Sequence, residues 1–296
     1  MSNMRQQFVA TVSEVMKNDE KVVLILGDIG VHGFRNTFAE HPTRTYNIGI
    51  LEQATVSMAS GLAMNNLIPI VHTIAPFLVE RSFEQLKDDF GYQKLNGNFV
   101  SVGASYDYAS LGCTHHCPAD IGILKNIPSM SITIPGTPKE FDTIFKEAYA
   151  DPNPTYYRLS EDKNNEDQDV HFGKANIIKK GNDAVIIAVG PILQNVIEAT
   201  EGMDVTILYY TSIRPFDSET LKANYIPNKK VIICEPYYMG ALTWDVTEAL
   251  KPHAVQIEHI GVPHEFLREY GTRQEHHKHL GLDTEGIKNK IKNFLN

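Results

Sequence analysis

The chain has 296 residues, enough for two domains that each bury a hydrophobic core. Its formal net charge is −9, with 36 acidic and 27 basic residues, which argues against nucleic acid or an anionic membrane as the main partner. No apolar run approaches the ~18 residues that cross a bilayer, and the N-terminus lacks the pattern of a secretory signal. Three cysteines are too few for a disulfide framework, so we expect a cytoplasmic protein.

The first half of the chain alternates short apolar runs with segments of helical periodicity. The expected strands are 21–26, 67–73, 99–104, 130–134 and 156–160. The expected helices are 5–17, 52–64, 77–95 and 137–150. Strands and helices that alternate at this spacing form a parallel sheet with helices on both faces. The pattern therefore predicts a first α/β domain over residues 1–160.

A polar, acidic segment, 161–176, then predicts a linker. A second alternating series follows, with expected strands at 184–190, 205–210, 230–235 and 255–260. Its expected helices lie near 191–201, 218–224, 240–251 and 284–295. The predicted fold class is thus α/β, with two consecutive three-layer domains whose sheets are mostly parallel, the second over residues 177–296.

The stretch YNIGILEQATVSMASGLAMNN, residues 46–66, contains the first candidate site residue. A strand-like YNIGI leads to Glu52 and then to a helix of small residues that another helix could approach closely. On composition alone, Glu52 is an acidic residue that the helix dipole favours in a first turn. The motif NIGILEQ followed by ASGLA, however, resembles the pyrimidine-binding domain of the transketolase-like thiamine diphosphate enzymes.

This resemblance implies a set of cofactor-binding residues. Glu52 would hydrogen-bond N1′ of the aminopyrimidine ring and act as a catalytic acid–base group. Ile50 belongs to the same motif. The segment APFLVERSFEQLKDD is similar to the family segment that follows, in which Phe77 would stack on the pyrimidine and Arg81 lies in the next helix. Core packing is the alternative for Phe77. Asp28 in LGDIG resembles a strand-end residue near the cofactor.

The stretch LGCTHHC, residues 111–117, could instead be a metal site by spacing. Adjacent residues of an extended chain project in different directions, so one tetrahedral ion would not readily take both histidines. The longer segment GCTHHCPADIGILKNIPSM resembles the substrate loop of the same family. The resemblance implies that His115 is catalytic and contacts the donor sugar, with His116 also on the substrate. Cys113 and Cys117 are then packing residues, and no metal ligand is assigned to this chain.

Two departures from the family pattern bear on the substrate. The family aspartate that contacts a sugar hydroxyl is Leu111 here, and the arginine that binds substrate phosphate is Glu161. A carboxylate at that position would repel a phosphate. Arg158 and Arg5 are the residues left as possible anion contacts. A further departure is His264, which replaces an aspartate of the family's GVPD motif. Leu111 and Glu161 therefore leave three classes of acceptor open: a nucleotide-linked sugar, an unphosphorylated sugar or another carbonyl compound.

The family's GDG…NN motif for the diphosphate and its Mg²⁺ is absent, since GDI (27–29) has no third glycine. This absence predicts a subunit of a split transketolase whose partner, the N-terminal-half subunit, supplies most of the Mg²⁺ site, in an α2β2 assembly. The expected reaction is two-carbon ketol transfer. Three alternatives stay open: the β subunit of a 2-oxo acid dehydrogenase E1, a deoxyxylulose-phosphate synthase-like enzyme, and an inactive regulatory subunit.

Overall fold

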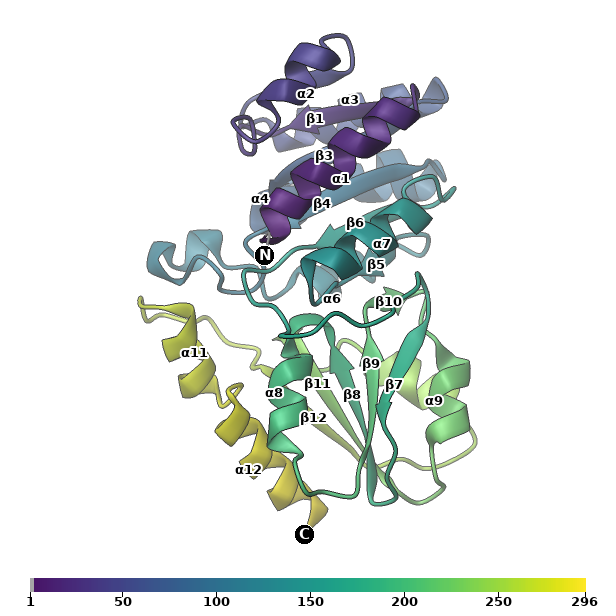
Figure 1. Cartoon of the computed structure of the whole chain (residues 1–296), viewed down its shortest axis with the longest axis vertical. Helices are drawn as coiled ribbons and strands as arrows, with labels where there is room; N and C mark the ends of the chain where they lie inside the picture. Colours follow the sequence, from purple (N-terminus) through teal and green to yellow (C-terminus); the bar gives the residue numbers. More distant parts are fainter. Residues whose placement is uncertain (1–2) are drawn as a thin grey trace.

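The computed structural model describes residues 3–296, and its first sheet has seven strands in the order β10-β5-β6-β4-β3-β1-β2 (Figure 1). The strands are β1 (Val22–Leu26), β2 (Thr45–Asn47), β3 (Ile68–Ile74), β4 (Gly97–Val102), β5 (Ser131–Thr133), β6 (Pro154–Arg158) and β10 (Ser212–Arg214). All neighbours are parallel except β10 and β5. Because β10 comes from the second half of the chain, this sheet joins the two halves.

Side chains that alternate along the strands divide this core into two layers. On one face, Leu24 and Ile70 pack in a cluster with α1 (Met4–Asn18) and α7 (Pro138–Ala148). On the other face, Ile25 and Val71 pack with α3 (Glu52–Met64) and the π-helix Leu86–Tyr92. The other helices of this half are α2 (Arg35–Glu40), α4 (Ala75–Val79), α5 (Phe83–Gln85), α6 (Asp120–Leu124) and the 3₁₀ turns Ala109–Leu111 and Cys113–His115.

The prediction of one helix over 77–95 is wrong, because this segment is divided into α4, α5 and the π-helix. The Ser82 hydroxyl donates to the Leu78 carbonyl, and the Arg81 amide bonds five residues back to Pro76. Side-chain bonds to the preceding turn bend helices. The bend lies beside Arg81, which pairs with Glu52 of α3.

The second sheet has five strands in the order β12-β11-β8-β9-β7. They are β7 (Ala175–Lys179), β8 (Ala184–Val189), β9 (Thr206–Tyr210), β11 (Lys230–Tyr238) and β12 (Ile257–Val262). Only β7 and β9 are antiparallel. The helices are α8 (Leu193–Ala199, after the 3₁₀ turn Gly190–Ile192), α9 (Ser218–Asn224), α10 (Thr243–Ala249), α11 (Arg273–Leu280) and α12 (Thr284–Leu295).

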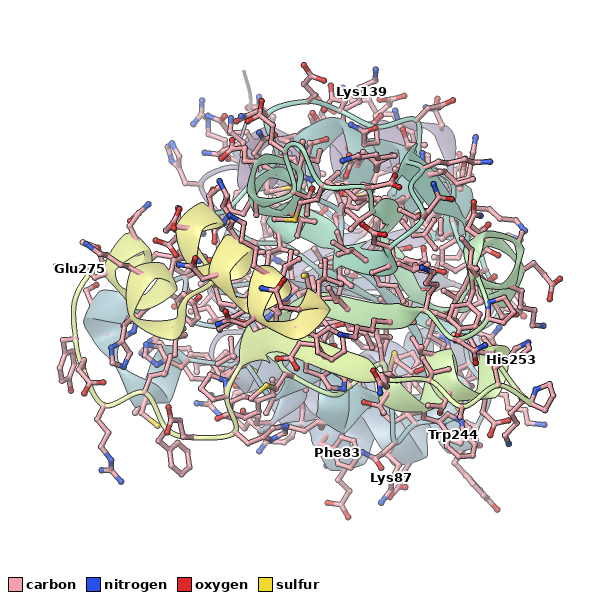
Figure 2. All side chains as sticks on the ribbon, turned by 90° about the horizontal axis from the view of Figure 1, so that it is seen from below. Phe83, Lys87, Lys139, Trp244, His253 and Glu275 are labelled. Atoms are coloured by element: carbon pink, nitrogen blue, oxygen red, sulfur yellow. The ribbon has the colours of Figure 1, made fainter. Side chains whose placement is uncertain are left out.

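These helices again cover both faces of the sheet, so the predicted fold class is confirmed. Ile186 packs in the cluster that includes α8 and α12, and Ile187 in the cluster that includes α9 and α10. Figure 2 shows α12 and α11 one after the other, with Glu275 of α11 at one edge of the molecule and Trp244 of α10 on another side. In Figure 1, α11 extends beyond the second sheet towards the first domain.

The predicted domain bounds, 1–160 and 177–296 with a linker at 161–176, stay a prediction. The segment 161–176 has no helix and reaches a strand only at Ala175. It is nevertheless anchored, since Asn164 and Val170 are buried. Within residues 3–296, no helix is both long and apolar enough to cross a membrane.

The two domains meet at a buried ion pair. Arg158, at the end of β6, is 1% exposed, and its Nε lies 2.7 Å from Oδ2 of Asp120. Its Nη2 donates to the Ser105 hydroxyl at 2.6 Å, and that hydroxyl donates to the carbonyl of Pro236 in the second domain. Burial opposes the charge, but Asp120 raises the pKa of Arg158 above its usual range. This side chain therefore ties β6, the loop after β4 and the second domain together.

Replacing Arg158 by Met should lower the free energy of unfolding by about 3–5 kcal/mol, because Asp120 would stay buried without its cation. Urea denaturation of the full chain measures this change. Arg268→Met is the matched control, because Arg268 is exposed and should change stability little. Equal denaturation midpoints for the two variants would contradict the structural role of Arg158.

Candidate active site

Glu52 begins α3 at the turn that follows β2. Gly49 makes this turn with a φ of 81°, a conformation that residues with a side chain rarely adopt. Glu52 is 2% exposed, and its Oε2 accepts a hydrogen bond of 2.6 Å from Nη1 of Arg81. Its Oε1 is buried and has no hydrogen-bond partner. A buried carboxylate oxygen without a donor is costly, so Oε1 is a natural acceptor for a ligand.

Arg81 links Glu52 to an aromatic side chain. Its guanidinium carbon lies 4.2 Å from the centre of the Phe77 ring, a cation–π contact. Phe77 in turn meets the His115 ring edge to face, with ring centres 5.4 Å apart. Glu52, Phe77, Arg81 and His115 thus form a continuous set, which we call the Glu52 cluster. The fold brings together four predicted residues that come from three separate segments.

His115 lies in the 3₁₀ turn Cys113–His115, which begins after Gly112 with a φ of 73°. Its Nδ1 lies 2.9 Å from the Thr114 hydroxyl. Within residues 3–296, Nε2 of His115 makes no hydrogen bond, so it can donate to or accept from a substrate oxygen. The Tyr108 ring is 6.3 Å from the His115 ring. Burial raises the pKa of Tyr108, and the charge of Arg5 opposes this rise.

Two other predicted cofactor residues lie outside these contacts. Asp28 follows β1 with a φ of 61°, and its side chain accepts a hydrogen bond of 3.1 Å from Asn47 at the end of β2. Ile50 is 64% exposed, two residues before Glu52. Neither contacts the Glu52 cluster among the described residues, so their cofactor contacts stay predictions.

The predicted substrate residues are separated by the fold. His116 is buried against α11, where its ring centre is 5.8 Å from that of His276. Burial and then the neighbouring His276 lower the pKa of His116. Arg158 is engaged with Asp120 at the domain junction. The substrate contacts of His116, Arg158 and Arg5 therefore stay predictions without geometric support.

The sequence analysis missed two aromatic residues around the loop that carries His115. Tyr108 faces His115. Tyr270 packs on Gly112, where an added Cβ would meet the Tyr270 ring at 2.8 Å. Tyr108 stands close enough in sequence to have been considered with the loop. No sequence signal indicated Tyr270, because its contact with Gly112 joins segments that lie far apart in the chain.

The histidines and cysteines of LGCTHHC diverge rather than converge on one point. Cys113 is exposed and Cys117 is buried. The Cys117 thiol lies 3.6 Å from Oε1 of Glu80, and burial raises its pKa. Within residues 3–296, no group of three or more His, Cys, Asp and Glu side chains is arranged to hold a metal ion. The geometry gives the zinc alternative no support.

Comparison with known families agrees with this geometry. The family model described as "Transketolase, pyrimidine binding domain" matches residues 1–166. The model described as "Transketolase, C-terminal domain" matches residues 173–287.

Two relatives and one solved structure match almost the whole chain. An uncharacterized 33.6 kDa protein in the fasciation locus of Rhodococcoides fascians is 37% identical over 99% of this chain and 95% of its own. One subunit of the apulose-4-phosphate transketolase of Phocaeicola vulgatus is 31% identical over 96% of this chain and 94% of its own. A structure described as "Split gene transketolase, inactive beta4 tetramer" has a TM-score of 0.86 and 24% identity, with 99% of this chain and 97% of that chain covered.

The order of the two matched domains and the near-complete overlap with a separate transketolase subunit agree with the resemblance found in the sequence. The chain belongs to the transketolase family of thiamine diphosphate-dependent enzymes, with a pyrimidine-binding domain followed by a C-terminal domain.

Proposed function

We propose that this chain is one subunit of a split transketolase, which transfers a two-carbon ketol unit from a ketose donor to a carbonyl acceptor. The observation that carries the proposal is the buried, unpartnered Oε1 of Glu52, a residue that Arg81 connects to Phe77 and His115. The Phocaeicola vulgatus relative, which is named as a single subunit of a transketolase, supports the same assignment.

The residues of the Glu52 cluster fit the pyrimidine half of thiamine diphosphate. Oε1 of Glu52 would accept a hydrogen bond from the ring, while Arg81 holds Oε2. Phe77 offers an apolar ring next to this acceptor, and stacking on a heteroaromatic ring is favourable. When bound, the cofactor supplies the carbon that carries the two-carbon unit. His115, with Nε2 free, would hydrogen-bond oxygens of the donor.

A partner subunit would complete the site. The chain has no GDG…NN motif, so we propose that the diphosphate and Mg²⁺ are held mainly by an N-terminal-half subunit in an α2β2 enzyme. The surface beside Glu52 suits such a partner, since Ile50 and Leu51 are 64% and 57% exposed and Met58 on α3 is also exposed. Exposed apolar groups that lie together mark interaction sites. The free cysteines fit our proposal of a cytoplasmic enzyme.

We propose that the acceptor substrate has no phosphate group on the part that lies near Glu161. The Glu161 carboxylate lies 2.7 Å from Nη1 of Arg273, so the charge of that arginine is already matched. Leu111, in place of an aspartate, is 51% exposed and offers no hydrogen bond to a sugar hydroxyl. Both features favour an unphosphorylated or nucleotide-linked carbonyl acceptor.

The direct test of the proposal is co-purification with the N-terminal-half subunit and a two-carbon transfer assay, first with the native chain and then with Glu52→Gln. We expect Glu52→Gln to lower turnover roughly 10²–10⁴-fold, the usual range for a positioned acid–base group. Glu84→Gln, which changes an exposed residue of α5, should keep native turnover. If Glu52→Gln kept native turnover, the proposed acid–base role of Glu52 would be wrong.

The loop that carries His115 allows a second test. His115→Ala should lower donor turnover by roughly 10²–10³-fold, because a hydrogen bond to developing charge is lost. The double variant Cys113→Ser with Cys117→Ser should fold and stay largely active, since serine can also donate to Glu80. Metal analysis of the native complex should find no stoichiometric zinc. One zinc per chain, together with collapse of the cysteine variant, would show that this loop is a metal site.

A further inference from the structure

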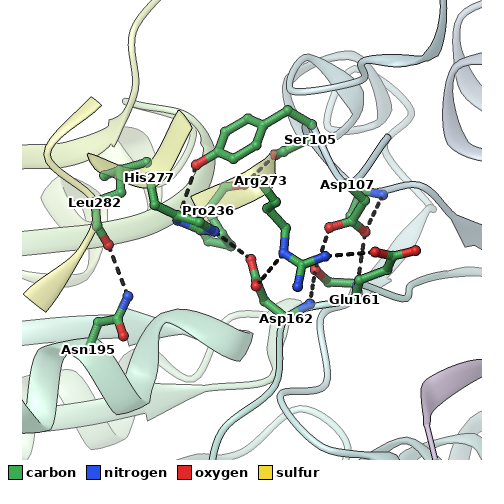
Figure 3. Close-up of polar contacts among 12 residues, drawn as sticks. Ser105, Asp107, Glu161, Asp162, Asn195, Pro236, Arg273, His277 and Leu282 are labelled. Atoms are coloured by element: carbon green, nitrogen blue, oxygen red, sulfur yellow. Dashed lines mark hydrogen bonds and ion pairs between the residues drawn. The ribbon is translucent and has the colours of Figure 1, made fainter. Parts of the chain in front are cut away.

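A cavity of about 540 Å³ lies where the two domains meet α11 and α12. Its walls are residues 104–107 after β4, the segment 158–165, the start of α8, and residues 274–284 of α11 and α12. We call it the junction cavity, and Figure 3 shows polar contacts around it. No member of the Glu52 cluster lines it. Its volume falls within the ~300–1,000 Å³ of small-molecule sites.

An ion-pair network fixes α11 beside this cavity. Asp162 lies between two side chains of α11, 2.6 Å from Nε of Arg273 and 2.8 Å from Nε2 of His277 (Figure 3). Arg273 also reaches Glu161. Burial opposes ionisation of Asp162, but the bond from His277 and the charge of Arg273 lower its pKa. These contacts join α11 to the end of the first domain, so the two walls of the cavity hold a defined position.

Besides Asp162, the carboxylates that line the cavity already have donors. Asp107 accepts bonds from the Ser160 hydroxyl and from two backbone N–H groups, and burial, then Asp162, raise its pKa to about 7. Glu198 accepts bonds from two side chains. Asp283 caps the start of α12. Most carboxylates of the lining therefore need no hydrogen-bond donor from a ligand.

The unengaged polar side chains of the lining are donors instead. Lys163 and Asn165 come from the segment 158–165, and Gln274 and Lys278 from α11. Within residues 3–296, none of these four side chains makes a hydrogen bond or an ion pair. Gln274 and Lys278 are four residues apart, so they share one face of the helix. All four side chains are exposed, and each wall, the segment 158–165 and α11, supplies one lysine and one amide.

We infer that the junction cavity binds a small polyhydroxylated anion, whose phosphate or carboxylate group lies between Lys163 and Lys278. Lysine binds such groups as a compact positive charge with three donors. The amides of Gln274 and Asn165 would bond the ligand's hydroxyl groups. A ligand in this position connects α11 to the segment that Asp162 already binds. It thereby holds His276 against His116, next to the loop residue His115.

Hydrogen–deuterium exchange of the full chain tests this inference with three probes: glycerol 3-phosphate, glycerate and glycerol. We expect one or both anions to protect the backbone amides of α11 in a saturable manner, and glycerol to give no protection. Comparing glycerol 3-phosphate with glycerate shows whether the site prefers a phosphate or a carboxylate group. The test needs neither thiamine diphosphate nor the partner subunit, so its result does not depend on the proposed function.

Paired variants make the test specific. Lys163→Gln with Lys278→Gln should weaken apparent binding roughly tenfold or more. Lys180→Gln with Lys292→Gln removes the same charge from exposed lysines outside the cavity and should leave binding unchanged. The inference is wrong if neither anion protects α11, or if protection is the same in both double variants.

Discussion

The ion pair of Arg158 with Asp120 determines where the loop that carries His115 lies. Ser105 precedes that loop and Asp120 follows it, and Arg158 contacts both while 1% exposed. A buried ion pair keeps its geometry only if its other donors and acceptors are also satisfied. Arg158 meets this condition through Ser105, whose hydroxyl continues to the second domain. One side chain therefore fixes both ends of the loop that carries His115 and the position of the C-terminal domain.

The loop fixed in this way faces a second charged group, Glu52, that is only half satisfied. Arg81 holds one oxygen of Glu52 and covers Phe77, while the other oxygen stays buried without a donor. This arrangement leaves an unmet hydrogen bond at the position where we propose that the cofactor binds. The exposed apolar residues Ile50 and Leu51 lie directly before it. In our proposal, Glu52 therefore lies on the pyrimidine side of an active site, next to exposed apolar residues that a partner subunit would cover.

Local patterns predicted most strands and part of the site, but they missed β7 and β10 and the contacts between distant charges. The apolar run KVVLIL became β1, and the amphipathic pattern at 284–295 became α12 with the same bounds. The order of the family-like motifs predicted that one site contains Glu52, Phe77, Arg81 and His115. Helix α11 (RQEHHKHL) was missed because it has little apolar periodicity and docks through ion pairs. Likewise, nothing in the sequence shows that Asp120 faces Arg158, so that arginine was expected on a substrate anion.

We propose that Glu52 of this chain activates a cofactor whose diphosphate is held by another subunit. The most direct measurement is the rate at which the C2 proton of bound thiamine diphosphate exchanges with solvent, followed by NMR with Mg²⁺ present. We expect fast exchange only when this chain and the N-terminal-half subunit are combined, and slow exchange with either alone. Fast exchange with the N-terminal-half subunit alone, or tight Mg²⁺-dependent cofactor binding by this chain alone, would contradict it.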